Sequence, residues 1–113
     1  MNFLNRFLKS KVTDAPAYSS DEQAVLIYID GEDLEGSIPV QEALIDLLED
    51  ESAGMFDGNE VGGGKIVLFL YGPDAELLYQ RIEPVLRADA FCHGARVIIR
   101  WGGPGTPQRE VNL

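Results

Sequence analysis

One short stretch, which runs from three glycines to a proline and an aspartate, restricts the fold more than any other part of the chain. The apolar run over residues 66–71 has the length of a strand and is rich in β-branched and aromatic residues. Gly72 and Pro73 end this run, and Asp74 is suited to cap a following helix. The glycines at 62–64 indicate a hairpin turn, because a phosphate-binding loop would follow its strand and open a helix.

Strands and helices alternate around this stretch. Besides residues 66–71, strands are predicted over residues 23–30, 54–61, 95–101 and 108–113. Apolar residues at helical spacing predict helices from Pro39 to about Asp50 and over residues 75–88. The first helix would then carry Glu49, Asp50 and Glu51 near its C-terminal end, where the helix dipole disfavours negative charge.

The order strand, helix, strand, strand, helix, strand resembles the split β-α-β unit of the ferredoxin-like superfold over about residues 23–101. The resemblance implies an α+β sandwich, in which two helices cover one face of an antiparallel sheet and leave the other face open. We expect a single such domain over residues 22–113, including a C-terminal strand. Residues 1–21 are expected to form a short amphipathic helix and a linker. The superfold hosts unrelated functions and implies no reaction.

The net charge of −10 is unevenly distributed along the chain. Residues 1–11 carry three bases and no acid, residues 12–64 carry fourteen acids and no Lys or Arg, and residues 65–113 carry six bases and five acids. An acidic half of this kind argues against binding a phosphate backbone. It indicates either a solvated acidic face or a surface that attracts a basic partner. The candidate acidic contacts are Glu32, Asp33, Glu35, Glu49, Asp50 and Glu51.

Strand alternation places the charged and phenolic strand residues on one side of the sheet, away from the helices. The predicted contact residues on this open face are Tyr28, Phe69, Tyr71, Arg96, Ile98 and Arg100. A second subunit, residues 1–11, residues 108–113 or a ligand could cover such an apolar face. Aromatic residues on a sheet are typical of RNA-recognition domains, but the required glycine–aromatic signature is absent after Lys65.

Chemistry-bearing motifs are weak. Cys92 and His93 are each the sole residue of their type, so together they supply neither a closed zinc site nor a disulfide. The acidic loop that begins at Asp30 lacks the glycine and glutamate positions of an EF-hand. We therefore predict no catalytic residue, no metal site and no cofactor. No apolar run has the length of a membrane span, and we expect a cytoplasmic protein that binds no nucleic acid.

These patterns lead to three functional hypotheses. The first is a non-enzymatic protein-binding module that self-associates through the open sheet face. The second is an acidic inhibitor, such as an immunity protein, that neutralises a basic partner through residues 12–64, which carry no Lys or Arg. The third is a small enzyme or ligand-binding dimer, with Tyr28, Tyr71, Arg96 and Arg100 as the polar groups of its sheet face.

Overall fold

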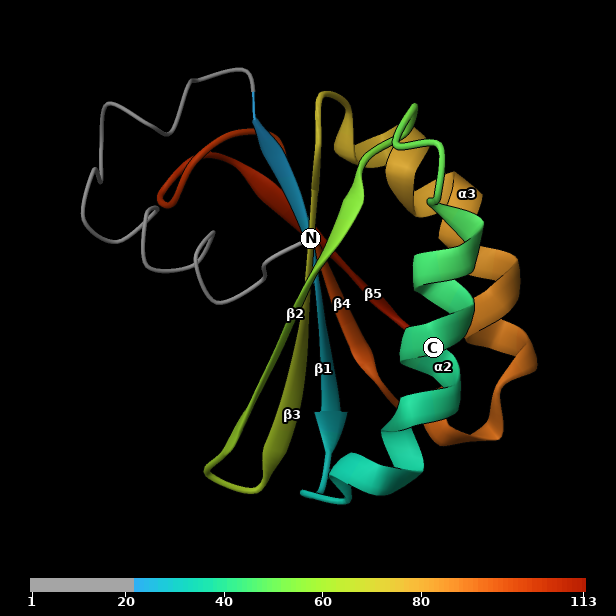
Figure 1. Cartoon of the computed structure of the whole chain (residues 1–113). Coiled ribbons are helices and arrows are strands. Elements are labelled where there is room, and N and C mark those ends of the chain that lie inside the picture. The colour runs from blue at the N-terminus through green and yellow to red at the C-terminus, as the bar shows by residue number, and fades with distance from the viewer. Residues whose placement is uncertain (1–21) are drawn as a thin grey trace.

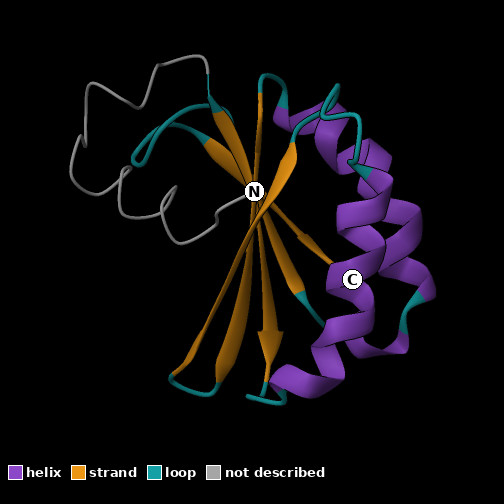
Figure 2. Cartoon of the chain, viewed as in Figure 1, coloured by secondary structure: helices purple, strands orange, loops and turns teal. Residues whose placement is uncertain are grey.

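The computed structural model describes residues 22–113, which form a five-stranded antiparallel sheet with two α-helices packed on one face (Figures 1 and 2). The elements in chain order are β1 (Gln23–Asp30), α2 (Leu34–Leu47), β2 (Met55–Gly62), β3 (Lys65–Gly72), α3 (Ala75–Ala88), the 3-10 helix η2 (Ala90–Cys92), β4 (Arg96–Arg100) and β5 (Gln108–Asn112). The α+β class and the predicted strands are thus confirmed, with small differences at their ends.

The strand order across the sheet is β2-β3-β1-β4-β5. Elements β1 to β4, with the two α-helices between them, follow the predicted chain order of strand, helix, strand, strand, helix, strand. Strand β5 pairs with β4 and adds a fifth strand, so the predicted ferredoxin-like order is matched only in part. Strands β2 and β3 form a hairpin with Gly63 and Gly64 at its tip, at φ 62° and 81°. Positive φ at both turn residues defines a type I′ turn, which suits the right-handed twist of paired strands and favours glycine.

The main core lies between the sheet and the two helices. Its strand residues alternate as predicted: Val25, Ile27, Ile29, Ile66, Leu68, Leu70, Val97 and Ile99 are buried against the helices. Leu44 of α2 and Leu78 and Ile82 of α3 complete this layer. Trp101 follows the end of β4 at Arg100 and remains 37% exposed, so it does not belong to this core.

Helix α2 begins earlier than predicted. The predicted start was Pro39, with residues 31–36 as a loop, but the Asp33 carboxylate caps the helix by accepting a hydrogen bond from the Gly36 amide at 2.9 Å. The helix also ends earlier, at Leu47. The expectation that Glu49, Asp50 and Glu51 occupy its last turn is therefore wrong. These residues follow the helix, where the Asp50 carboxylate accepts a hydrogen bond from the Ser52 amide at 3.0 Å.

Helix α3 has the predicted bounds. The Asp74 carboxylate accepts hydrogen bonds from the Glu76 and Leu77 amides, so Asp74 is the predicted cap. The amphipathic helix predicted within residues 1–11 lies outside the described residues. In the part of the chain that the structure describes, no helix has the length and apolar character needed to cross a membrane.

Candidate functional site

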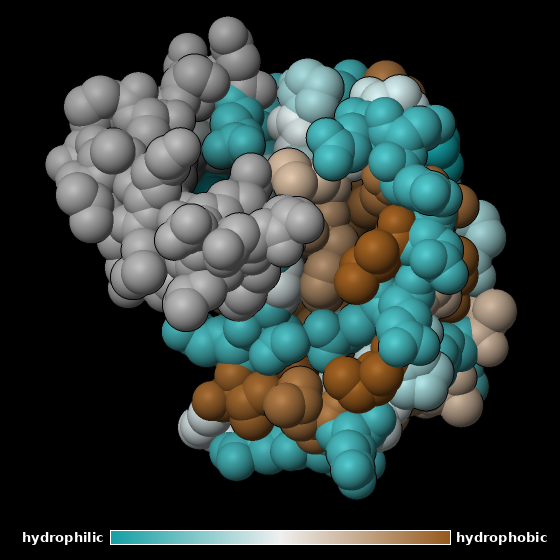
Figure 3. Space-filling model, in the orientation of Figure 1, coloured by the Kyte–Doolittle hydropathy of each residue, from teal (hydrophilic) through white to brown (hydrophobic). Residues whose placement is uncertain are grey.

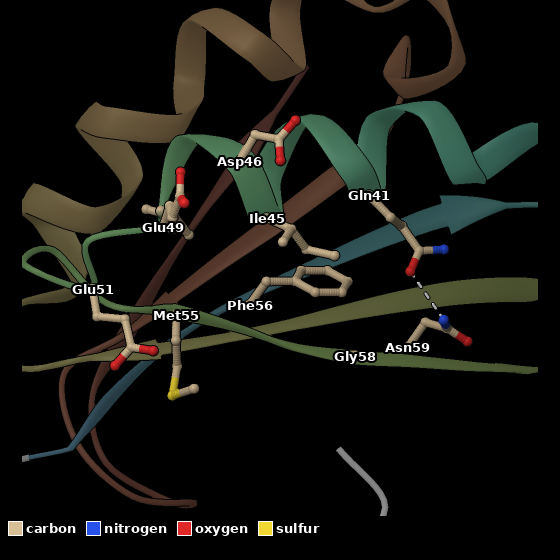
Figure 4. A pocket seen from close by; sticks show the side chains of 10 residues that line it. Gln41, Ile45, Asp46, Glu49, Glu51, Met55, Phe56, Gly58 and Asn59 are labelled. Atoms are coloured by element: carbon tan, nitrogen blue, oxygen red, sulfur yellow. Dashed lines mark hydrogen bonds between the residues drawn. The ribbon is translucent and has the colours of Figure 1, made fainter. Parts of the chain in front are cut away.

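A groove between α2 and β2, with a volume of about 580 Å³, is the main functional candidate within residues 22–113 (Figure 4). Its lining residues come from these two elements and the segment that joins them: Gln41, Ile45, Asp46, Leu48, Glu49, Glu51, Met55, Phe56, Gly58 and Asn59. Figure 4 shows the Ile45 and Phe56 side chains facing each other between the helix and the strand. The groove floor is therefore apolar, whereas three carboxylates and no Lys or Arg occur among the lining residues.

An exposed apolar stripe extends this groove along α2. Leu34, Ile38 and Ile45 lie on one side of the helix and are 41%, 40% and 50% exposed, and Val61 of β2 is 38% exposed. These four are among only six large apolar side chains that are exposed within residues 22–113. Figure 3 shows hydrophobic areas on this side of the molecule, with a hydrophilic band between them. Concentrated apolar exposure of this kind is typical of a binding surface.

A chain of hydrogen-bonded polar side chains joins α2 to β2. Asn59 Nδ2 donates to Gln41 Oε1 at 3.0 Å (Figure 4), and Gln41 Nε2 donates to Ser37 Oγ at 2.8 Å. The Ser37 hydroxyl in turn donates to the Leu34 carbonyl at 2.6 Å. Gln41 and Ser37 are buried, so their side chains lose their hydrogen bonds to water on folding. The internal hydrogen bonds replace those lost bonds. The bridge between Gln41 and Asn59 thus sets the spacing of the groove walls.

An acidic ridge, formed by Glu35, Glu42, Asp46 and Glu49, borders the apolar stripe. With 3.6 residues per turn, these positions fall on one side of the helix axis, next to the stripe. Glu35, Glu42 and Asp46 belong to α2, Glu49 follows its end, and all four are exposed. Neither α2 nor β2 contains a Lys or Arg. Apolar contact area beside uncompensated negative charge suits a ligand that is both apolar and cationic.

The six predicted acidic contacts separate into two groups. Glu49 and Glu51 line the groove, and Glu35 lies on the acidic ridge. The other three carboxylates bind the chain's own backbone: Glu32 accepts from the Gly64 amide at 2.7 Å, Asp33 caps α2, and Asp50 accepts from Ser52. The hydrogen bond from the Ser52 amide is the main cause that lowers the pKa of Asp50.

The sequence interpretation missed Glu42, Asp46 and the apolar stripe. The signal was present: when the helix is started at Leu34, apolar residues recur at 34, 38 and 45 on one side, with acids beside them. The assumption that Gly36 ended a loop concealed it. The participation of Met55, Phe56 and Asn59 had no local signal, because it depends on where β2 lies relative to α2.

The open sheet face brings the six predicted aromatic, apolar and basic residues together. Ala24, Leu26 and Ile98 are buried there, and Tyr28, Phe69 and Tyr71 pack against them. The Arg96 guanidinium lies 4.7 Å from the centre of the Tyr28 ring and 3.6 Å from a Glu110 carboxylate oxygen. Arg100 Nε donates to the Gly102 carbonyl at 2.9 Å. Both arginines therefore contact neighbouring groups of the chain.

The Cys92 side chain belongs to the core, and His93 is exposed. Burial, with a smaller contribution from the Asp89 charge, raises the pKa of the Cys92 thiol to about 11. The nucleophilic form of cysteine is the thiolate, so this thiol is suited to packing and unsuited to nucleophilic chemistry. Within residues 22–113, no group of three or more His, Cys, Asp or Glu side chains is placed to hold a metal ion.

We expect iodoacetamide at about pH 8 to alkylate Cys92 at least about tenfold more slowly in the folded chain than in denaturant, because the folded thiol is buried and protonated. Mass spectrometry of quenched samples measures the rate, and Cys92 is the sole cysteine. Free glutathione, alkylated under both conditions, corrects for the effect of denaturant on the reagent. Equal corrected rates would contradict a buried thiol.

Comparison of the chain with protein-family models, curated proteins and solved structures yields no significant match.

Proposed function

We propose that this chain is a non-enzymatic protein-binding module, and that the α2–β2 groove holds a basic segment of a partner protein that also carries apolar side chains. The proposal includes a cytoplasmic location and a ferredoxin-like arrangement of β1 to β4. It joins two expectations from the sequence, a binding module and an acidic surface for a basic partner, at one place on the molecule.

One observation carries this proposal: the exposed apolar stripe and the acidic ridge run side by side along α2, next to the groove. The apolar floor supplies contact area, since each Å² removed from water stabilises a complex by roughly 25 cal/mol before the costs of association. The carboxylates add attraction for Lys and Arg and raise the association rate at low salt. No catalytic group is required for this role.

Self-association through the open sheet face is a second candidate. Tyr28, Phe69 and Tyr71 surround buried apolar residues on that face, as in a surface that another subunit covers. The two functions use opposite faces of the sheet, so they are compatible. The enzyme hypothesis remains a prediction, and no arrangement of the described residues favours it.

The test of the groove is a matched pair of charge variants of the full-length chain. Glu42→Gln combined with Glu49→Gln removes two charges beside the apolar stripe, and both side chains are exposed. Glu22→Gln combined with Glu110→Gln is the control: Glu22 precedes β1, and Glu110 belongs to β5, at the opposite edge of the sheet from β2.

We expect a basic protein to be captured from native lysate at about 50 mM salt and released at about 500 mM salt. Binding of the purified partner should be about 5- to 30-fold weaker for the groove variant, because each exposed charge contributes up to about 1 kcal/mol. The control variant should bind like the wild type. If both variants bind equally, the acidic ridge is not the contact and the proposal fails.

A further inference from the structure

Strand β2 lies at an edge of the sheet, and within residues 22–113 its only strand neighbour is β3. In a two-residue type I′ hairpin, the residues that flank the turn form a hydrogen-bonded pair, here Gly62 and Lys65. Hydrogen-bonded and non-hydrogen-bonded pairs then alternate along an antiparallel ladder. Glu60–Val67 is therefore hydrogen-bonded, whereas Val61–Ile66 and Asn59–Leu68 are not.

It follows that the main-chain N–H and C=O groups of Asn59 and Val61 point away from β3, toward the free edge. The side chains of these two residues lie on the helix side of the sheet, because their partners Leu68 and Ile66 belong to the main core. Asn59 also lines the groove. The free main-chain edge and the groove between α2 and β2 are therefore adjacent.

We propose that the partner segment binds in an extended conformation and adds to the sheet as a sixth strand along β2. This inference rests on the proposed function of the groove and specifies how the segment binds. Main-chain bonds to Asn59 and Val61 hold the segment, and its alternate side chains lie over the apolar surface of Val61, Ile38 and Ile45. The same helix-side positions also carry lysine or arginine, which interacts with the acidic ridge, because the intervening side chains point to the open face of the sheet.

The bulge in β2 limits the length of the added strand. The register shifts between Phe56 and Gly58, and a bulge interrupts regular pairing along an edge. The regular part of the edge therefore runs from Gly58 to the hairpin at Gly62. A segment of about five residues matches this part, at about 3.4 Å per residue.

Charge selects the kind of occupant. A second copy that paired its own β2 with this edge would bring two acidic ridges and two copies of Glu51 together without any Lys or Arg from α2 or β2. Like charges at such an interface oppose association. A basic segment from another protein meets no such repulsion, so we assign the edge to a basic partner.

The test uses a defined probe, a blocked seven-residue peptide of sequence Thr-Leu-Thr-Lys-Thr-Leu-Thr, whose leucine and lysine side chains share one face of a strand, added to the ¹⁵N-labelled full-length chain. Amide hydrogen exchange at Asn59 and Val61 should slow at least about tenfold at saturation, because new hydrogen bonds protect these amides. Exchange at Glu60, whose amide already bonds to β3, should not change. A peptide of the same composition with its leucine and lysine side chains on opposite faces of the strand should bind more weakly.

Two matched controls separate strand addition from other binding. Methylation of the peptide's main-chain nitrogens on the edge-facing side should weaken binding at least about tenfold, whereas methylation on the opposite side should not, because only the first removes bonds to β2. Ile45→Ser should weaken binding about tenfold through lost apolar contact, and Leu77→Ser, a similarly exposed position on α3, should not.

Three outcomes would overturn strand addition. The first is a peptide that binds at Ile45 without protecting Asn59 and Val61, which indicates a helical or side-chain-only mode and leaves the proposed function intact. The second is that the peptide does not bind at about 1 mM. The proposed function is then still tested by the partner-binding experiment with the charge variants. The third is protection of both amides in the free chain together with a dimer by light scattering, which assigns the edge to a second copy.

Discussion

Replacement of Leu68 by alanine should lower the free energy of unfolding by about 3 kcal/mol. Leu68 lies on β3 between the neighbouring strands, and its fully buried side chain packs in the layer beneath the helices. Truncation removes three buried carbon atoms and leaves a cavity that a close-packed core fills only in part, at a cost of about 2–5 kcal/mol. Urea unfolding followed by circular dichroism measures the change at constant m-value.

Leu77→Ala is the matched control, because it removes the same atoms from a leucine of α3 that is 56% exposed. Its effect should be within about 0.5 kcal/mol of the wild type, since surface substitutions away from special features are usually that small. Equal losses for the two variants would show that the layer around Leu68 is not packed as described. The same comparison also tests whether Leu77 is a neutral position for the binding experiments.

Replacement of Gly54 by alanine should lower the free energy of unfolding by about 2–3 kcal/mol. Gly54 has φ 149°, which L-residues rarely adopt, and a Cβ there would lie 2.5 Å from the Tyr71 carbonyl oxygen and 3.2 Å from the Leu78 side chain. In the alanine variant, the backbone at residue 54 must therefore move away from the backbone at Tyr71, at the point where β2 begins. Unfolding in urea again gives the size of the loss.

Gly62→Ala is the control for this change, because a Cβ at Gly62 would meet no atom within 4 Å and its backbone is not in the left-handed region. Its effect should be within about 0.5 kcal/mol. The comparison also bears on the groove, since Gly54 precedes Met55 and Phe56, which line it. A Gly54 variant as stable as the Gly62 variant would mean that the close approach of these two segments is absent.

Much of the sheet was predictable because its signals are local. Alternation between Val25, Ile27 and Ile29 assigns three side chains to the core whatever their partners are, and the structure buries all three. Helix α3 has the predicted bounds because Asp74 and the apolar spacing indicate the same start. The start of α2 was predicted wrongly because residues 31–36, with a glycine at each end, indicated a loop, and the Asp33 cap outweighs that signal here.

The candidate site was predicted only in part. Acidic character was evident, and Glu49 and Glu51 do line the groove. Composition does not distinguish these two carboxylates from Asp33 and Asp50, which serve as local hydrogen-bond acceptors. That difference depends on the position of each backbone amide, and such positions follow from the helix ends.

The sequence by itself determined the elements and the buried side of each strand, because side-chain alternation and helical spacing depend on near neighbours in the chain. Only the tertiary structure decided that α2 lies beside the edge strand β2. The hydrogen bond between Gln41 and Asn59 joins residues 18 positions apart, and the groove exists because the sheet order places β2 at an edge. Strand order is a property of long-range packing, so the surface that we propose for binding follows from the assembled sheet.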